Sequence, residues 1–364
     1  MSSDRAMTFT DDDHRHMAEA LRLAEKGRLT ADPNPAVGCV IVADGEVLGR
    51  GFHRAAGEPH AETLALQEAG ARARGATAYV TLEPCSHQGR TPPCANALIE
   101  AGVGAVISAM PDPDERVAGA GHDRLARAGI TVRTGLMESK ARELNRGFVS
   151  RHERGRPWVR VKLATSLDGF TAGADGQSQW ITGEAARADV QRWRAASSCI
   201  LTGIGTVLAD DPRLNVRLPG FERELLRVVV DSDGRLPERL RLTGLPGPVL
   251  VASCTEPRSE AGMEWWQLPR DLSGRVNLTV LMARLAEREI NTVHVEAGPV
   301  LSGALLQAGL VDELLIYQAP CLIGRGRSLL ALAGMEKFDQ RLHLDLIDYR
   351  RLGSDWRFLY RPQT

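Results

Sequence analysis

The chain has 364 residues, a length that favours two domains over a single hydrophobic core. Its 45 basic and 46 acidic side chains leave a formal net charge of −1, which argues against a nucleic-acid-binding protein, because such proteins usually carry an excess of basic charge. No apolar run reaches about 18 residues and the N-terminus is polar, so we expect neither a membrane span nor a signal peptide.

The first part of the chain predicts one compact α/β unit. Residues 11–13 offer caps for an amphipathic helix that ends at Gly27, and two strands over 37–42 and 46–52 follow, joined by the hairpin turn Asp44-Gly45. Further helices are expected over 60–69, from Pro92 or Pro93 to 101, and over 125–128, and further strands over 79–82, 106–107 and 130–132. Helices alternating with strands after a hairpin predict a three-layer domain, in which helices cover both faces of a sheet.

This unit contains three side chains that bind soft metals, His60, Cys85 and Cys94, and a carboxylate at Glu62. The predicted elements place His60 and Glu62 in the first turn of one helix, Cys85 in the loop after a strand, and Cys94 in the first turn of the next helix. Helix N-termini favour thiolate over thiol and hydroxide over water. A His/Cys/Cys zinc site keeps a fourth position for water, lowers the pKa of that water to about 7 and is typical of deaminases, in which a glutamate moves the protons.

The alternatives are a closed structural zinc site, with His53 or His87 as the fourth ligand, or no metal. A closed site would leave Glu62 without a reason to stand beside His60, so the pattern favours catalytic zinc. The gap between Cys85 and Cys94 is wider than the two-residue gap of nucleobase deaminases. The remaining cysteines are expected to be plain thiols in a cytosolic protein, because six cysteines do not make a disulfide framework in a chain of this size. They are Cys39, Cys199, Cys254 and Cys321.

Residues 30–38, 57–62 and 81–94 resemble the deaminase half of the bifunctional riboflavin-biosynthesis deaminase/reductase family. The wide cysteine spacing is normal in that family and distinguishes it from cytidine, guanine and tRNA-adenosine deaminases. The resemblance implies one zinc ion on His60, Cys85 and Cys94, and Glu62 as the catalytic proton carrier. It also implies that the substrate is a diaminopyrimidinone with a phosphoribosylamino group, deaminated to the uracil analogue.

The same resemblance suggests which residues touch the substrate. Asn34, in a loop flanked by prolines, is expected to hydrogen-bond the pyrimidine edge. His53, His87 and Arg90 are candidates for contact with the ribose phosphate. For the two histidines, contacts with the backbone are an equal alternative, whereas the planar guanidinium of Arg90 suits phosphate.

Residues 151–156 are strongly basic and precede Pro157 and a new apolar run, so we expect a short linker and not a nucleic-acid-binding arm. Strands are then predicted over 158–164, 199–203, 228–231, 249–252, 292–296 and 314–318, with helices that include 183–194 and 281–288. This is a second α/β sheet. It carries no Gly-x-Gly-x-x-Gly fingerprint, and the glycine-rich turn at 298–303 is either a phosphate-binding helix start or a plain connection.

Residues 161–169, 178–182, 206–212 and 295–299 resemble the reductase half of the same family. The resemblance implies a fold like that of dihydrofolate reductase, NADPH as the cofactor, and hydride transfer to a ring-opened imine at the sugar carbon, which converts ribosyl to ribityl. The expected organisation is therefore a zinc-dependent pyrimidine deaminase domain at 1–149 and an NADPH-dependent reductase domain at 150–364.

Site residues of the reductase also follow from the resemblance. The expected NADPH-binding residues are Ala164, Trp180, Thr206, Asp210, Gly298, Pro299, Val300, Leu301, Ser302, Gly303 and Ala304. The expected substrate-binding residues are Ser178, Arg194, Leu214, Arg217 and Glu296, with Arg194 and Arg217 as phosphate partners. Lys162 is the candidate for stabilising charge at the reacting sugar, or else a solvated cation at a strand end. Trp180 binds the cofactor or simply packs in the core.

The expected partner is the small phosphoribosylaminopyrimidine, with neither nucleic acid nor membrane, and an exposed sheet edge in the second domain favours a homo-oligomer. The most serious alternative is an enzyme in which one half is inactive. A polynucleotide-editing deaminase would leave the second domain unexplained. A degenerate binding protein would have lost metal ligands that this chain retains.

Overall fold

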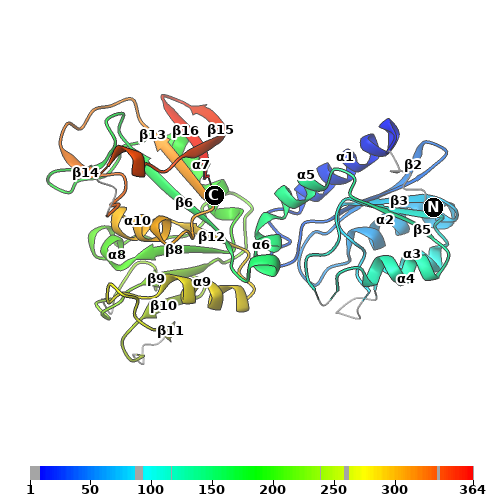
Figure 1. Ribbon diagram of the computed structural model, residues 1–364, viewed down its shortest axis with the longest axis horizontal. Coiled ribbons are helices and arrows are strands. Elements are labelled where there is room, and N and C mark those ends of the chain that lie inside the picture. Colours follow the sequence, from blue (N-terminus) through cyan, green and yellow to red (C-terminus); the bar gives the residue numbers. More distant parts are fainter. Residues whose placement is uncertain are drawn as a thin grey trace. The chain divides into compact units, whose positions relative to one another are not determined.

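The computed structural model describes residues 9–86, 93–115, 117–237, 239–257, 262–333 and 337–363 (Figure 1). The chain divides into two compact units, Met1–Arg154 and Gly155–Thr364. No helix in these described ranges is both long enough and apolar enough to cross a bilayer.

The first unit is built on a mixed five-stranded sheet with the order β2-β1-β3-β4-β5. Its strands are β1 (Gly38–Ala43), β2 (Glu46–Phe52), β3 (Thr77–Val80), β4 (Ala105–Ser108) and β5 (Thr131–Thr134). β1 is antiparallel to both of its neighbours, β2 and β3, whereas β3, β4 and β5 are parallel. Successive residues of β1 point to opposite faces, so that Cys39 and Ile41 belong to one hydrophobic cluster and Val40 and Val42 to another.

Helices cover both faces of this sheet, which confirms the predicted three-layer arrangement (Figure 1). On one face lie α2 (Ala61–Ala69), α3 (Cys94–Ala101) and α4 (Ala120–Arg127), with the short 3-10 turn η1 (Gly70–Ala73) after α2. On the other face lie α1 (Asp11–Lys26), α5 (Glu138–Leu144) and α6 (Arg146–Arg154).

Several boundaries differ from those predicted. Thr10 caps α1, and Asp13 completes a capping box with it, so the cap precedes the aspartates proposed for that role. β3 lies two residues earlier than expected, at Thr77–Val80. α6 continues to Arg154, so most of the expected basic linker is helical. Phe148 and Val149 are buried and anchor this helix, whose last turn is basic.

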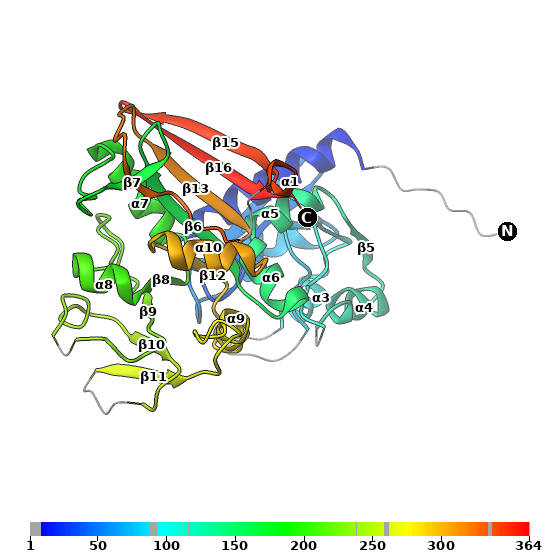
Figure 2. The same cartoon turned by 60° about the vertical axis from the view of Figure 1, so that its left-hand side comes forward.

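The second unit contains a nine-stranded sheet with the order β11-β10-β9-β8-β12-β6-β13-β16-β15 (Figure 2). Its strands are β6 (Trp158–Thr165), β8 (Cys199–Gly203), β9 (Leu226–Val230), β10 (Val249–Ser253), β11 (Met263–Gln267), β12 (Thr292–Val295), β13 (Glu313–Gln318), β15 (Leu344–Leu352) and β16 (Asp355–Pro362). The first seven strands in the sheet order are parallel, and β16 and β15 extend it as an antiparallel hairpin. A separate two-stranded sheet pairs β7 (Phe170–Gly173) with β14 (Gly326–Ser328).

Helices α9 (Leu278–Glu287) and α10 (Pro299–Gln307) pack on one face of the large sheet. α7 (Glu184–Ala195) and α8 (Ile204–Asp210) pack on the other, and the 3-10 turn η2 (Phe338–Gln340) precedes β15. β6, β8 and β12 are adjacent and parallel, so their carboxyl ends meet at one edge of the sheet, where α8 and α10 begin. Ligands of open α/β sheets bind at such an edge.

Five strands were not expected from the sequence: β7, β11, β14, β15 and β16. β15 illustrates the reason, because seven of its nine residues are exposed and their side chains mix acidic, basic and apolar types. A strand of that kind lacks the strict polar–apolar alternation on which the predictions depend.

The backbone of α2 lies directly against β2. A Cβ atom placed on Gly51 would lie 2.0 Å from the carbonyl oxygen of Ala61, and one on Gly49 would lie 2.1 Å from that of Ala65. Only glycine at these two positions lets the helix approach so closely. The N-terminus of α2 is therefore held at a fixed place over the sheet.

We predict that Gly51→Ala destabilises the first unit by roughly 1–3 kcal/mol, because the added methyl group must push two backbone segments apart. Differential scanning calorimetry of the full chain would measure the change. Gly205→Ala is the matched control, since a Cβ atom there meets no atom within 4 Å. Equal transition temperatures for Gly51→Ala and the wild-type chain would contradict the prediction.

Candidate active sites

Three potential metal ligands converge in the first unit. His60 is the N-cap residue of α2, Cys94 is the first residue of α3, and Cys85 lies in the loop after β3. His60 Nδ1 lies 3.2 Å from Cys94 Sγ and 3.6 Å from Cys85 Sγ, and the three ligand atoms all lie within 4.8 Å of one another. Ligands around tetrahedral zinc are separated by roughly 3.5 Å, so the distances and the N/S/S donor set both fit a zinc ion.

The pKa values of the two cysteines move in opposite directions in this arrangement. The hydrogen bond from Cys94, together with the nearby His60, holds the pKa of Cys85 well below its ordinary value, and the same bond raises the pKa of Cys94. The backbone N–H of Cys94 also donates to Cys85 Sγ over 3.3 Å. Thiolate is the form that binds zinc, so binding of the metal would release the remaining thiol proton.

Glu62 lies in the first turn of α2 and is only 3% exposed. Burial raises its pKa to about 7, and the neighbouring Cys85 thiolate contributes in the same direction. A carboxylate with such a pKa exchanges protons readily at neutral pH. Glu62 hydrogen-bonds Cys94, which places it next to the ligands without its being one of them.

Asn34 and His53 lie beside this cluster. Asn34 Nδ2 is 3.0 Å from His53 Nε2, and the His53 and His60 rings meet edge to face with centroids 5.2 Å apart. His53 Nδ1 is also 3.3 Å from the carbonyl oxygen of Pro59. His53 does not belong to the group of ligand atoms, which argues against its serving as a fourth ligand in a closed site. His87 and Arg90 lie outside the described residues.

Asn145, which the sequence analysis did not single out, holds the Asn34 loop. Its side chain accepts a hydrogen bond from Ala36 N over 2.8 Å and donates one to Ala36 O over 3.0 Å. An amide that faces both backbone groups of one residue fixes that residue in place. No local sequence signal could have identified this pairing, because Asn145 and Ala36 are 109 residues apart in the chain.

In the second unit, a buried ion pair lies at the carboxyl edge of the parallel strands. Arg194 on α7 donates to both oxygens of Glu296, just after β12, over 2.5 and 2.8 Å. Burial alone would raise the pKa of Glu296, but the paired guanidinium outweighs it and holds the pKa well below its usual range. Arg194 also donates to Asn215 O over 2.8 Å, so it orders the segment that carries Leu214 and Arg217.

Lys162 on β6 is half-buried beside this pair, and burial lowers its pKa. It is therefore not the solvated cation at a strand end that was the alternative interpretation. His294 on β12 was not predicted as a site residue; it is fully buried, and its Nε2 lies 3.4 Å from Glu296 Oε1. Burial lowers the pKa of His294, so it stands as a neutral ring behind the carboxylate.

The turns after β8 and β12 form the part of the edge that suits a dinucleotide. A Cβ atom on Gly205 or Gly298 would meet no atom within 4 Å. One on Gly203 would lie 3.1 Å from Leu301 Cδ2, so the turn after β8 lies against the first turn of α10. α10 begins with Pro299, and its first N–H groups point out of the helix at this edge. Open space next to a helix start fits the phosphates of NADPH.

The predicted NADPH-binding residues are not equally accessible. Val300 is half-exposed at the start of α10, whereas Ser302 is buried with its hydroxyl donating to Ala297 O over 3.3 Å. Leu301 and Ala304 pack against the hydrophobic cluster, and a Cβ atom on Gly303 would lie 2.1 Å from Ala331 O. The remaining predicted positions lie at the end of β6 and in α8. They are Ala164, Thr206 and Asp210.

Ser178 and Trp180 lie between β7 and α7. Trp180 is 70% exposed, which rules out the core-packing alternative, and the guanidinium of Arg187 lies 4.8 Å from its ring centroid. Leu214 is buried with a φ of 48°, and Arg217 is exposed, its Nη1 donating to Asn215 Oδ1 over 2.9 Å. These roles remain predictions.

Comparison with known proteins gives matches to both units. Residues 10–110 match the family model of the cytidine and deoxycytidylate deaminase zinc-binding region, and residues 157–358 match that of the RibD C-terminal domain. Riboflavin biosynthesis protein RibD of Escherichia coli K12 is 50% identical over 361 residues, which cover 94% of this chain and 97% of that protein.

Solved structures also match both units. Acinetobacter baumannii RibD has a TM-score of 0.91 at 45% identity, covering 97% of this chain and 99% of that one. A Thermotoga maritima diaminohydroxyphosphoribosylaminopyrimidine deaminase/5-amino-6-(5-phosphoribosylamino)uracil reductase has a TM-score of 0.87 at 32% identity, with the same coverage. The expected fold, a cytidine-deaminase-like domain followed by a reductase domain, is confirmed. The chain belongs to the RibD family of riboflavin biosynthesis proteins.

Proposed function

We propose that this chain catalyses two consecutive steps of riboflavin biosynthesis. The first is hydrolytic deamination of diaminohydroxyphosphoribosylaminopyrimidine to 5-amino-6-(5-phosphoribosylamino)uracil, in a domain at 1–149. The second is reduction of the ribosyl group to ribityl by NADPH, in a domain at 150–364. The proposal depends above all on one observation: a deaminase-type His/Cys/Cys cluster with Glu62 beside it, in a member of this family that matches 97% of its Escherichia coli relative.

In the deaminase site, His60, Cys85 and Cys94 would hold zinc, which supplies Lewis acidity that activates water at neutral pH. Glu62 accepts a proton as water adds to the amino-bearing ring carbon. It passes this proton to the ring nitrogen. It then takes the proton of the newly formed hydroxyl group and gives it to the amino group, so that the C–N bond breaks, the C=O bond forms and ammonia leaves. Asn34, held by the ordered loop and by His53, hydrogen-bonds the pyrimidine edge.

In the reductase site, the start of α10 and the turn before α8 would hold NADPH, which supplies hydride. Arg194 and Glu296 form a rigid pair that orders the segment of Leu214 and Arg217, and Glu296 is left to accept hydrogen bonds from sugar hydroxyls. Arg217, exposed next to that pair, is the better placed of the two arginines for phosphate. Lys162 is placed to stabilise negative charge that develops at the sugar oxygen.

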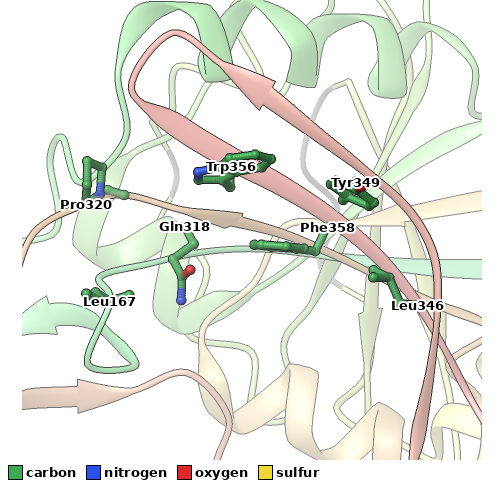
Figure 3. Close-up of a pocket in the computed structure, with 8 residues that line it drawn as sticks. Leu167, Gln318, Pro320, Leu346, Tyr349, Trp356 and Phe358 are labelled. Carbon is green, nitrogen blue, oxygen red and sulfur yellow. The ribbon is translucent and has the colours of Figure 1, made fainter.

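We propose in addition that the chain forms a homo-oligomer through the β15–β16 hairpin. Trp356, Phe358 and Tyr360 form a row of aromatic rings on one face of β16. The ring centroid of Tyr349, on β15, lies 6.1 Å from that of Trp356. Tyr349, Trp356 and Phe358 line a pocket of about 520 Å³. Leu346, Gln318 and Pro320 also contribute to its lining (Figure 3). Such an aromatic face typically packs against a partner.

The edge strand β15 also suits pairing with a second copy of itself. Asp345 and Asp348 precede Arg350 and Arg351 along the strand, so two antiparallel copies would set acidic against basic side chains. We place the protein in the cytosol, which agrees with its six free cysteines.

For the deaminase, we predict that Glu62→Gln retains zinc but lowers ammonia release by about 10²- to 10⁴-fold, because the amide cannot carry the proton. Zinc content and ammonia release would be measured on the same sample. NADPH oxidation with the deaminated substrate should continue at the wild-type rate. Glu68→Gln, on an exposed position of the same helix, serves as the control. Ammonia release by Glu62→Gln at the native rate would disprove the role of Glu62.

For the reductase, we predict that Lys162→Met lowers the kcat of NADPH oxidation by about 100-fold, with unchanged NADPH affinity and unchanged deamination. The reason is that the methionine keeps the apolar stem but cannot stabilise charge at the sugar. Lys140→Met, at an exposed position of the first unit, is the control. If the wild-type chain oxidises no NADPH with the deaminated substrate, the second half is inactive and the bifunctional assignment fails.

For the oligomer, we predict that Trp356→Glu converts the protein to a monomer in sedimentation velocity, because a carboxylate cannot be buried unpaired in an aromatic interface. Leu272→Glu, at a fully exposed leucine elsewhere on the unit, should leave the assembly intact. A wild-type chain that sediments as a monomer, or a Trp356→Glu variant that remains assembled, would contradict the proposal.

A further inference from the structure

Glu83 lies two residues before the ligand Cys85, and the proposed reaction gives it no role. Its side chain is completely buried. One carboxylate oxygen accepts hydrogen bonds from Asp112 N over 3.1 Å and Gly119 N over 3.0 Å. The other accepts from Gly121 N over 2.9 Å and His122 N over 3.2 Å. A buried carboxylate is tolerated when backbone N–H groups surround it in this way.

These bonds tie two segments of the first unit together. The four donors belong to the loop between β4 and α4 and to the first turn of α4, which lies beside α3 in Figure 1. Glu83 N in turn donates to Met110 O over 3.0 Å, at the beginning of the same loop. The carboxylate therefore binds this loop to the chain segment immediately before Pro84 and Cys85.

The contact beneath Pro84 is too close for any side chain. A Cβ atom on Gly121 would lie 1.9 Å from the carbonyl oxygen of Pro84 and 3.1 Å from Glu83 Oε1. On its other side, Cys85 is bonded to the start of α3, because Ala95 N donates to Cys85 O over 3.1 Å and Cys94 N donates to Cys85 Sγ. The segment that carries the ligand is thus held between the loop and the helix.

Cys85 needs such support more than the other two ligands do. His60 and Cys94 stand at the starts of helices, and α2 is fixed against β2 by the glycine contacts described above. Cys85 belongs to no helix or strand. Metal sites keep their geometry when residues behind the ligands fix them, and a loop ligand depends on this most.

We propose that Glu83 is a positioning residue of the metal centre, whose bonds to the β4–α4 loop fix the place of Cys85 Sγ opposite His60 and Cys94. This inference rests on the proposed deaminase function, because it assumes that the three residues hold zinc. Glu83 does not bind the metal or the substrate in this role. It acts through Cys85 alone.

Glu83→Gln is the sharpest variant to test it. Each carboxylate oxygen accepts two backbone N–H bonds, so whichever way the amide turns, its NH2 group faces two donors. The volume of the side chain stays the same. Glu83→Asp keeps both acceptor oxygens on a shorter stem and should recover part of the loss. Glu46→Gln, an exposed glutamate of the same unit, is the control.

We expect Glu83→Gln to raise the dissociation constant for zinc about 10- to 100-fold in competition with a chromophoric chelator. In the protein loaded with Co²⁺ alone, the thiolate-to-metal absorption bands should shift or weaken, while NADPH oxidation by the reductase stays at the wild-type rate. Glu83→Asp should fall between Glu83→Gln and the wild type.

If Glu83→Gln is folded, as shown by its circular dichroism, and binds zinc and Co²⁺ like the wild-type chain, the inference is wrong while the proposed function stands. The same holds if the variant is only less stable to heat, with an unaltered Co²⁺ spectrum. A wild-type chain that binds no zinc overturns the proposed function and this inference together.

Discussion

The deaminase unit depends on one constraint, the direct contact between the backbones of α2 and β2. Glycine residues in β2 make this contact possible. α2 approaches β2 until its carbonyl oxygens would touch any side chain at Gly49 or Gly51. This contact fixes the start of the helix, where His60 is the N-cap residue and Glu62 lies in the first turn. Gly121 does the same beneath Pro84. Glycines therefore determine where the metal ligands lie. They let backbone segments pack directly against each other, and segments packed so closely leave the ligands little room to move.

In the reductase unit, an ion pair holds the site residues in place, whereas in the deaminase unit close backbone contacts do so. Its site lies at the ends of parallel strands, where loops from distant parts of the chain must be kept in order. The Arg194–Glu296 pair joins α7 to the end of β12 and reaches the loop at Asn215 through a third hydrogen bond. A buried pair of this kind adds little net stability, but breaking it leaves an uncompensated charge. The pair therefore keeps α7, the end of β12 and the Asn215 loop in one fixed arrangement.

The sequence predicted the parts of this protein that depend on local pattern. The positions of His60, Glu62, Cys85 and Cys94 relative to helix starts and loops follow from capping residues and hydrophobic spacing, and the structure has them there. Thr10 was missed because three aspartates next to it are equally good caps. Asn145 and Glu83 were missed for a different reason. Their partners are backbone groups far away in the chain, and backbone groups leave no signature in the sequence.

Three buried glutamates in this chain show how environment decides what a carboxylate can do. Glu62 has burial and a thiolate beside it, which raise its pKa to about 7 and let it carry protons. Glu296 has an arginine on both oxygens, which keeps it ionised and rigid. Glu83 has four backbone N–H groups on its two oxygens, which tie it to a loop and organise that loop. Since burial is common to all three, it is the partner of each carboxylate that separates proton transfer, orientation and support.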